Sequence, residues 1–353
     1  MPSIQSAHTR RSPCIKPGTT LTACLAGLLI GTCFSARAAD TVKLKFADWL
    51  PLSHYTLNEA VKPWMETTRQ ASKGAIDFEY YPAQQIGKAK DMATLAQAGV
   101  ADIVHISPAY ISEKFPLSGV AELPDLFSNT CDGNRALMTL MRPGGFLDEK
   151  EYKPLGLRVL WAMTYAPYAI VTTNKKVTTL DDLKGLKMRT AGGAMDITAS
   201  QVGSVPIKMT GPDVLPSLQR GTLDGMFVTL LSLKPFDWQT ALKYMTTNVS
   251  TASFVSVFAI TEKGWNKLSP EQQKVLTETS EESVQRICTW VDTSNKKIIA
   301  DLQKEGMEEV LMTDAENAKL SERLAETRRR WAASLDGMGK SGTETLRRYQ
   351  EAM

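Results

Sequence analysis

Residues 42–46 read VKLKF, residues 76–80 read IDFEY and residues 102–106 read DIVHI. Each run is short and rich in residues that favour β-structure, which predicts three strands. The segments between them have helical patterns, over residues 57–72 and residues 88–98. Strands that alternate with helices favour parallel sheets with crossover helices, so the sequence predicts an α/β fold.

The same alternation continues along the chain, and the C-terminal part is then expected to be helical. Ser269 and Pro270 form an N-cap followed by proline at the first helical position, so a helix should run on past Cys288. Thr313 and Glu316 have the spacing that caps another helix. The other predicted elements are strands at 157–162, 168–173, 186–189, 205–209 and 226–228, helices at 194–202 and 213–220, and a capping box formed by Thr179 and Asp182.

The size of the chain favours two lobes. It has 353 residues, of which 43% are hydrophobic and 22% charged, an ordinary globular composition. A single core tends to split at this length. No linker rich in Gly, Pro and Ser separates two halves, so the chain is expected to cross between the lobes more than once.

The first 39 residues have the pattern of an export signal. A positively charged segment precedes an apolar run at residues 21–31, and a small-x-small cleavage site follows at residues 36–38. The apolar run is about half the roughly 20 residues that a membrane span needs, so we expect a cleaved signal peptide over 1–39 and a periplasmic location, with a retained anchor as the alternative. The basic residues of this segment are Arg10, Arg11, Lys16 and Arg37, and without them the formal charge of +3 becomes about −1. This balance gives no electrostatic case for nucleic-acid binding.

Cys131 and Cys288 are the cysteines that remain after the predicted signal peptide. A disulfide between them and two free thiols are both open, because the sequence does not place their Cα atoms within the roughly 7 Å that a bridge requires. Neither cysteine has a histidine nearby, so no zinc-site pattern is present.

The sequence has no recognisable catalytic machinery. It contains no G-x-S-x-G run and no H-E-x-x-H run. His105 lies inside an apolar strand without an identifiable partner, which favours a core or cleft-edge histidine over a general base. We therefore expect no catalytic residue, metal or cofactor, and binding is the natural function.

Several runs resemble the solute-binding proteins of TRAP (tripartite ATP-independent periplasmic) transporters, in the dicarboxylate-binding-subunit family. These runs are YPAQQIG at 81–87, GVADI at 99–103, LDDLKGLKMR at 180–189, GSVPIKM at 203–209 and LQRGTLDG at 218–225. Their order and spacing are those of the family. The resemblance implies two α/β lobes around a ligand cleft, with long C-terminal helices, crossing strands as a hinge, and closure on a small organic acid.

The resemblance also implies an organisation and partners. We expect lobe I to contain residues 40–166 and 253–290, and lobe II residues 167–252 and 291–353. The protein would deliver its ligand to the membrane permease subunits of a TRAP transporter, as a monomer or a homodimer. A periplasmic ligand-sensing module for a receptor is the alternative within binding, and a secreted enzyme is the alternative from another class.

Arg189 is the strongest candidate for a ligand-binding residue. The resemblance gives it the role of holding a carboxylate, and its place at the carboxyl end of a predicted strand is where open α/β sheets present ligand sites. Its planar guanidinium offers two parallel hydrogen bonds to a carboxylate. The other candidates follow strand or loop ends, and they are Trp49, Gln85, Ser107, Tyr110, Tyr168, Phe227 and Thr229.

Departures from the family pattern bear on the ligand. Family members often carry a proline after Arg-x, where this chain has Ala-Gly-Gly at 191–193. Acidic-sugar binders carry an asparagine shortly after the Asp-Gly pair, where this chain has MFVT at 226–229, and the second arginine of those relatives has no counterpart at 165–173. Fewer polar side chains indicate a less hydroxylated ligand, such as a keto, aliphatic or aromatic monocarboxylate.

Overall fold

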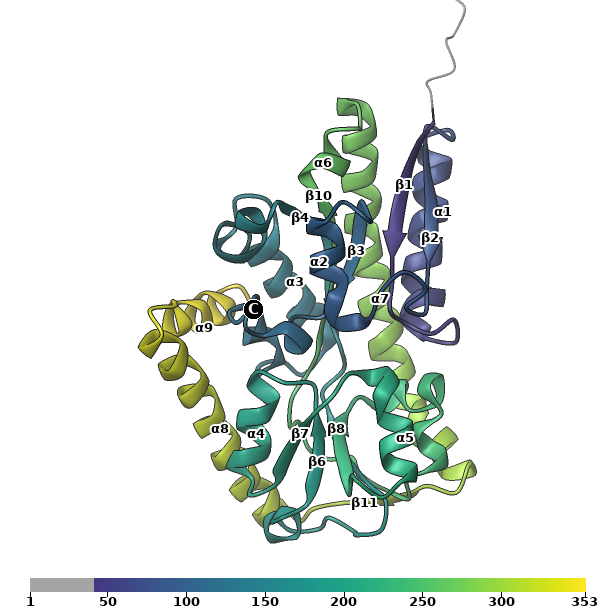
Figure 1. Cartoon of the computed structure of the whole chain (residues 1–353). Coiled ribbons are helices and arrows are strands. Elements are labelled where there is room, and N and C mark those ends of the chain that lie inside the picture. Colours follow the sequence, from purple (N-terminus) through teal and green to yellow (C-terminus); the bar gives the residue numbers. More distant parts are fainter. Residues whose placement is uncertain (1–40) are drawn as a thin grey trace, which may run out of the picture. The chain divides into compact units, whose positions relative to one another are not determined.

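The computed structural model describes residues 41–353, which form two β-sheets flanked by helices (Figure 1). The strand order is β2-β1-β3-β10-β4 in the first sheet and β11-β9-β5-β8-β6-β7 in the second. The first sheet contains β1 (Val42–Ala47), β2 (Ile76–Tyr81), β3 (Ile103–Ile106), β4 (Leu157–Thr164) and β10 (Val255–Thr261). The second contains β5 (Ala169–Thr172), β6 (Lys187–Thr190), β7 (Val205–Lys208), β8 (Gly225–Val228), β9 (Tyr244–Thr246) and β11 (Glu308–Val310). The predicted signal peptide, residues 1–39, lies outside the described residues.

The α/β class is confirmed, but the expectation of parallel sheets is wrong in part. β1 pairs in parallel with β2 and β3, and β6 pairs in parallel with β7 and β8. β10 is antiparallel to both of its neighbours, and β5 is antiparallel to β8 and β9. Both sheets are therefore mixed. The reason is long-range: β10 enters the first sheet from the second one, so no crossover helix sets its direction.

The chain passes between the sheets through two connections that lie side by side. One joins β4 to β5 and the other joins β9 to β10. The backbone N–H of Tyr165 donates to Phe254 O at 2.9 Å, and that of Tyr168 donates to Ala252 O at 2.9 Å. The Ser253 hydroxyl donates to Tyr165 O at 2.8 Å. These bonds make a two-stranded link between the sheets, as crossing strands require.

The helices form largely where the sequence predicts them. They are α1 (Lys62–Ala71), α2 (Met92–Gln97), α3 (Thr130–Met141), α4 (Ala194–Gln201), α5 (Val214–Gln219), α6 (Glu262–Trp265), α7 (Pro270–Lys304), α8 (Asp314–Gly337) and α9 (Gly342–Glu351). α7 has 35 residues, and its predicted N-cap is confirmed, because the Ser269 side chain accepts from Gln272 N in a capping box. The Thr313 cap of α8 and the capping box of Thr179 with Asp182 are confirmed as well. α3, α6, α9 and strands β9 to β11 are not among the predicted elements.

A disulfide joins Cys131 in α3 to Cys288 in α7, with Cα atoms 4.9 Å apart. This finding settles the question that the sequence leaves open. The long helix α7 also contacts α1 and β4 beside the first sheet, and β11 in the second. It is a third connection between the two sheets (Figure 1).

Aromatic side chains fill the core of the first sheet. The rings of Trp161 and Phe258 stack with centroids 3.7 Å apart, and Phe46 meets Phe258 edge-on at 6.1 Å. Such packing keeps the strand ends that face the second sheet in fixed positions. Within residues 41–353 no helix has the length and apolar character of a membrane span.

Candidate functional site

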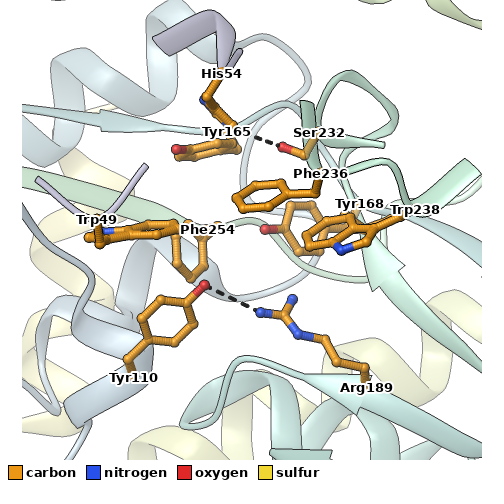
Figure 2. Close-up of a pocket in the computed structure, with 11 residues that line it drawn as sticks. Trp49, His54, Tyr110, Tyr165, Tyr168, Arg189, Ser232, Phe236, Trp238 and Phe254 are labelled. Atoms are coloured by element: carbon orange, nitrogen blue, oxygen red, sulfur yellow. Dashed lines mark hydrogen bonds between the residues drawn. The ribbon is translucent and has the colours of Figure 1, made fainter. Parts of the chain in front are cut away.

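A small pocket lies where segments that follow strands of both sheets meet (Figure 2). Its lining is formed by Trp49, His54, Tyr110, Tyr165, Tyr168, Arg189, Val228, Ser232, Phe236, Trp238 and Phe254. Most of these side chains are aromatic. The free space between them is about 20 Å³, which holds roughly one water molecule. A ligand larger than water therefore needs the two sides of the pocket to separate.

Arg189 supplies the positive charge of the pocket. It lies on β6, beside β8 and β7, and its side chain is almost wholly buried. Its Nε donates to Met209 O at 3.2 Å, and its Nη2 donates to Tyr110 Oη at 3.4 Å. Across residues 41–353 no carboxylate forms an ion pair with it. A buried charge without an opposite charge is costly, so this guanidinium is set up for an anionic partner.

A buried acid that acts on two tyrosines of the pocket does not offset that charge. Glu122 is buried, and burial raises the pKa of its carboxyl to about 8. Its charge, when present, acts on the hydroxyls of Tyr110 and Tyr168. Near neutral pH Glu122 is mostly protonated, so the pocket keeps the positive potential of Arg189.

Tyr110 connects the two sides of the pocket. It lies in the 3-10 turn Pro108–Ile111 after β3, and its hydroxyl accepts from the backbone N–H of Gly211 at 2.9 Å as well as from Arg189. Gly192, in the Ala-Gly-Gly turn after β6, approaches the same segment. A Cβ at Gly192 would lie 2.5 Å from Ala109 O, so only glycine allows this close contact. The looser turn noted in the sequence is thus a place where the two sides touch.

Aromatic rings form the walls. Trp49 lies 5.4 Å from Tyr110 and 6.5 Å from Phe254 between ring centroids. Phe236 and Trp238 stack at 4.5 Å on the opposite side, and Phe236 lies 6.4 Å from Trp49. Such walls bind flat apolar groups by area burial and ring contacts.

A second polar group lies away from Arg189 (Figure 2). His54 Nε2 is 3.4 Å from Ser232 Oγ, and His54 Nδ1 accepts from the backbone N–H of Thr56 at 3.2 Å. Burial lowers the pKa of His54 to about 3, so its imidazole is neutral at physiological pH. Because Nδ1 is an acceptor, the proton of the neutral ring lies on Nε2, facing Ser232.

Comparison with known proteins gives the family. The model of the bacterial extracellular solute-binding proteins, family 7, matches residues 46–334. The chain belongs to this family.

Relatives and solved structures agree with this assignment. The 2,3-diketo-L-gulonate-binding periplasmic protein of Escherichia coli is 26% identical over 269 residues, covering 75% of this chain and 79% of the relative. A TRAP solute-binding protein of Rhodoferax ferrireducens in complex with copurified benzoate has a TM-score of 0.80 at 22% identity, covering 88% and 97% of the two chains. A marine metagenome TRAP protein in complex with 3-hydroxybenzoate has a TM-score of 0.81 at 24% identity, covering 89% and 98%. The resemblance to TRAP solute-binding proteins is confirmed, and with it the two-lobe binding-protein architecture.

In this family 7 binding protein, the pocket brings together Arg189, Trp49, Tyr110 and Tyr168 of the residues predicted from the sequence. Gln85, Ser107, Phe227 and Thr229 do not line it. Gln85 is exposed in the turn after β2. Phe227 points to the opposite face of β8 from Val228, which does line the pocket, as strand alternation requires. Ser107 and Thr229 are buried with hydroxyls that lack a hydrogen-bond partner within the described part of the chain.

The remaining lining residues of the binding protein are not among those predicted. Ser232, Phe236 and Trp238 lie in consecutive 3-10 turns after β8. The signal for them is an aromatic-rich segment with a proline directly after a predicted strand, at residues 230–238. Tyr165 and Phe254 lie in the crossing connections, which the sequence does not delimit. His54 lies in the loop after β1, and its neighbours in the pocket, Ser232 and Phe236, follow β8 of the second sheet. The sequence does not show that these two segments meet.

A buried hydrogen-bonded network lies behind Trp49. His105 Nδ1 is 2.7 Å from Asp48 Oδ1, and His105 Nε2 is 2.7 Å from Ser256 Oγ. The His105 ring also lies 5.1 Å from Trp49 and 4.3 Å from Phe258. Asp, His and Ser are the residue types of a hydrolase triad, but all three are buried and none lines the pocket. In the binding protein this network supports the wall that carries Trp49.

Proposed function

We propose that this protein is the periplasmic solute-binding protein of a TRAP-type transporter and captures a small aromatic monocarboxylate in the pocket of Figure 2. The observation that carries the proposal is Arg189, a buried guanidinium in an aromatic pocket, with no acidic partner among the described residues. A carboxylate ligand supplies the missing charge through two charge-assisted hydrogen bonds. The ring of the ligand packs between the aromatic walls.

Capture requires the two sides of the pocket to open and close. The free space of about 20 Å³ is far smaller than a benzoate-sized ligand. We propose that lobe I (40–166 and 253–290) and lobe II (167–252 and 291–353) separate about the two crossing connections. In the closed state alone, the ligand contacts Tyr110 and Trp49 on one side and Arg189 on the other. Ligand binding therefore shifts the population toward the closed state. The closed complex is the form delivered to the membrane permease subunits.

The ligand class has support from the composition of the lining. Arg189 is the charged side chain among the lining residues, and the rest are mainly rings. Similar structures hold benzoate and 3-hydroxybenzoate. Both points favour an aromatic monocarboxylate over a polyhydroxylated sugar acid, in line with the missing asparagine and second arginine of acidic-sugar binders.

The proposal is tested by titration calorimetry with benzoate, hydroxybenzoates, pyruvate, succinate and sialic acid, on protein expressed from the full-length sequence. We expect an aromatic monocarboxylate to bind best. Arg189→Ala should weaken its binding about a hundredfold or more, because each charge-assisted hydrogen bond is worth about 1.5–3 kcal/mol. Arg220→Ala is the matched control, because Arg220 is exposed and is not among the lining residues. Equal binding by wild type and a folded Arg189→Ala variant would remove the basis of the proposal.

A further inference from the structure

His54 and Ser232 form a second polar end of the pocket. Both line it, and Figure 2 shows them across the aromatic rings from Arg189 and Tyr110. We propose that this pair binds a hydroxyl group on the ligand ring, so that the preferred ligand is a hydroxylated aromatic monocarboxylate. The inference rests on the proposed function and adds the residues that select the ring substituent.

The hydrogen-bonding capacity of the pair fits a hydroxyl group. The His54 Nε2–H is directed to Ser232 Oγ at 3.4 Å, a long bond that a ligand oxygen can replace or share. The serine hydroxyl both donates and accepts. A ligand hydroxyl, which also donates and accepts, can therefore bond to both residues. An unsubstituted ring would leave His54 and Ser232 with only their long mutual bond of 3.4 Å.

Because His54 and Ser232 are uncharged, this end of the pocket disfavours charged substituents on the ligand ring. His54 stays neutral because burial lowers the pKa of its imidazole, and Tyr55, stacked on it at 4.5 Å, adds no charge. Among the lining residues Arg189 is the cation, and it is committed to the first carboxylate. A second carboxylate or an ammonium group beside His54 and Ser232 would be buried without an opposite charge. The site is thus selective for a neutral hydrogen-bonding group.

The position of His54 is fixed by the surrounding structure. Its backbone N–H donates to Pro51 O at 2.9 Å, Thr56 N–H holds its Nδ1, and its ring packs edge-on against Phe236 at 5.5 Å. Ser232 lies in the 3-10 turn Leu230–Ser232 on the opposite side of the pocket. The pair therefore forms only when the two sides come together, so the ring substituent is read in the closed state.

The test is the ratio of dissociation constants for benzoate and for 3- and 4-hydroxybenzoate, with terephthalate as the dicarboxylate probe. In wild type we expect one hydroxybenzoate to bind about tenfold more tightly than benzoate, and terephthalate to bind more weakly than either. Ser232→Ala should remove most of this tenfold preference, so that the dissociation constants for the hydroxybenzoate and for benzoate differ by no more than about twofold. His54→Phe, which keeps the ring, should do the same. Ser283→Ala is the matched control, because Ser283 is buried in α7 outside the pocket.

The outcomes separate this inference from the proposed function. A preference that persists in Ser232→Ala and in His54→Phe, or a wild type that prefers benzoate or terephthalate, would overturn the inference while Arg189-dependent carboxylate binding still stands. Failure of every aromatic carboxylate to bind wild type would overturn both. Should His54→Phe not fold, Ser232→Ala alone decides, because it removes a single oxygen from a turn.

Discussion

The burial of Arg189 has opposite consequences for the stability of the ligand-free protein and for the binding role that we propose. Its guanidinium is buried, receives no opposite charge from residues 41–353, and makes hydrogen bonds only to Met209 O and Tyr110 Oη. A charge held in this way is destabilising until a ligand arrives, because burial removes its hydration. The same property suits Arg189 to the carboxylate-binding role that we propose for it.

We predict that Arg189→Met abolishes carboxylate binding but leaves the free energy of unfolding of the ligand-free protein equal to wild type or about 1 kcal/mol higher. Methionine fills a similar volume without a charge. Urea denaturation monitored by circular dichroism measures the free energy, and titration calorimetry measures binding. Arg220→Met controls for the substitution at an exposed position. A loss of several kcal/mol in Arg189→Met would mean that the arginine is primarily structural.

Glu122 gives a second residue-scale prediction, about pH. Burial raises the pKa of its carboxyl to about 8 in the folded protein, against 4.5 for the ordinary group. The folded state therefore binds more protons than the unfolded state between pH 4.5 and 8, and this group lowers stability as the pH rises through that window. The difference in stability between Glu122→Gln and wild type should increase with pH, by up to about 1.4 kcal/mol per pH unit. Urea denaturation at pH 5, 6.5 and 8 tests this.

Comparison of the two proteins at each pH isolates Glu122 from other buried groups. Burial also raises the pKa of Glu151 to about 7, and lowers that of His54 to about 3, so wild type and variant share both contributions. The Glu151 contribution falls with rising pH, and the His54 contribution rises with pH between about 3 and 6.5. A difference that stays constant over the three pH values would contradict the assignment of a protonated Glu122.

At the scale of elements, the disulfide joins helices that are distant in sequence. Cys131 in α3 and Cys288 in α7 are separated by 157 residues, and both helices pack on the first sheet beside β4. A bridge across so long a stretch restricts the unfolded chain strongly. The two crossing connections at β4–β5 and β9–β10 do not contain either cysteine, so we expect the bridge to stabilise the first sheet and its helices with little effect on the proposed closure.

We predict that the double variant Cys131→Ser, Cys288→Ser lowers the free energy of unfolding by about 2–5 kcal/mol and changes ligand affinity by less than about twofold. Denaturation and calorimetry of the same preparations provide both values. Wild type treated with a reductant should match the double variant. A large loss of affinity together with unchanged stability would place the bridge in the binding machinery instead.

At the scale of the whole molecule, the proposed closure would depend on contacts between the two sides of the pocket. Gly211 N–H donates to Tyr110 Oη, Ser53 Oγ donates to Pro235 O at 2.8 Å, and Gly192 lies against Ala109. These polar and backbone contacts accompany the ring contacts that Phe236 makes with Trp49 and His54. The proposed opening would break these contacts, and a ligand that bridges both sides would favour the closed state.

We predict that Gly192→Ala favours the open state. The new Cβ would lie 2.5 Å from Ala109 O, so the closed arrangement becomes strained and the apparent ligand affinity falls about tenfold if the closed population falls by that factor. Gly221→Ala is the matched control, because Gly221 also has a positive φ but no atom within 4 Å of an added Cβ. Calorimetry gives the affinity. Small-angle scattering with saturating ligand should give a larger radius of gyration for Gly192→Ala than for wild type. Equal affinities of the two variants would contradict the closure argument.

The sequence by itself determined the α/β class, the starts of the long helices and the family. These rest on local signals: alternation in 42–46, the Ser269 and Thr313 caps, and motifs such as LDDLKGLKMR at 180–189. Such signals depend only on residues that are close together in the chain, so the sequence shows them without the tertiary structure. Arg189 belongs to this group, because its motif and its strand end lie in one short segment.

The tertiary structure alone decided the strand directions, the disulfide and most of the pocket. β10 is antiparallel because of how the chain returns from the second sheet, and residues 131 and 288 meet because two helices pack on one face. Trp49 and Phe236 become neighbours only where segments after β1 and β8 face each other. The cause is the same in each case: these contacts join residues far apart in the chain, and their geometry is set by the packing of whole sheets, which no local pattern encodes.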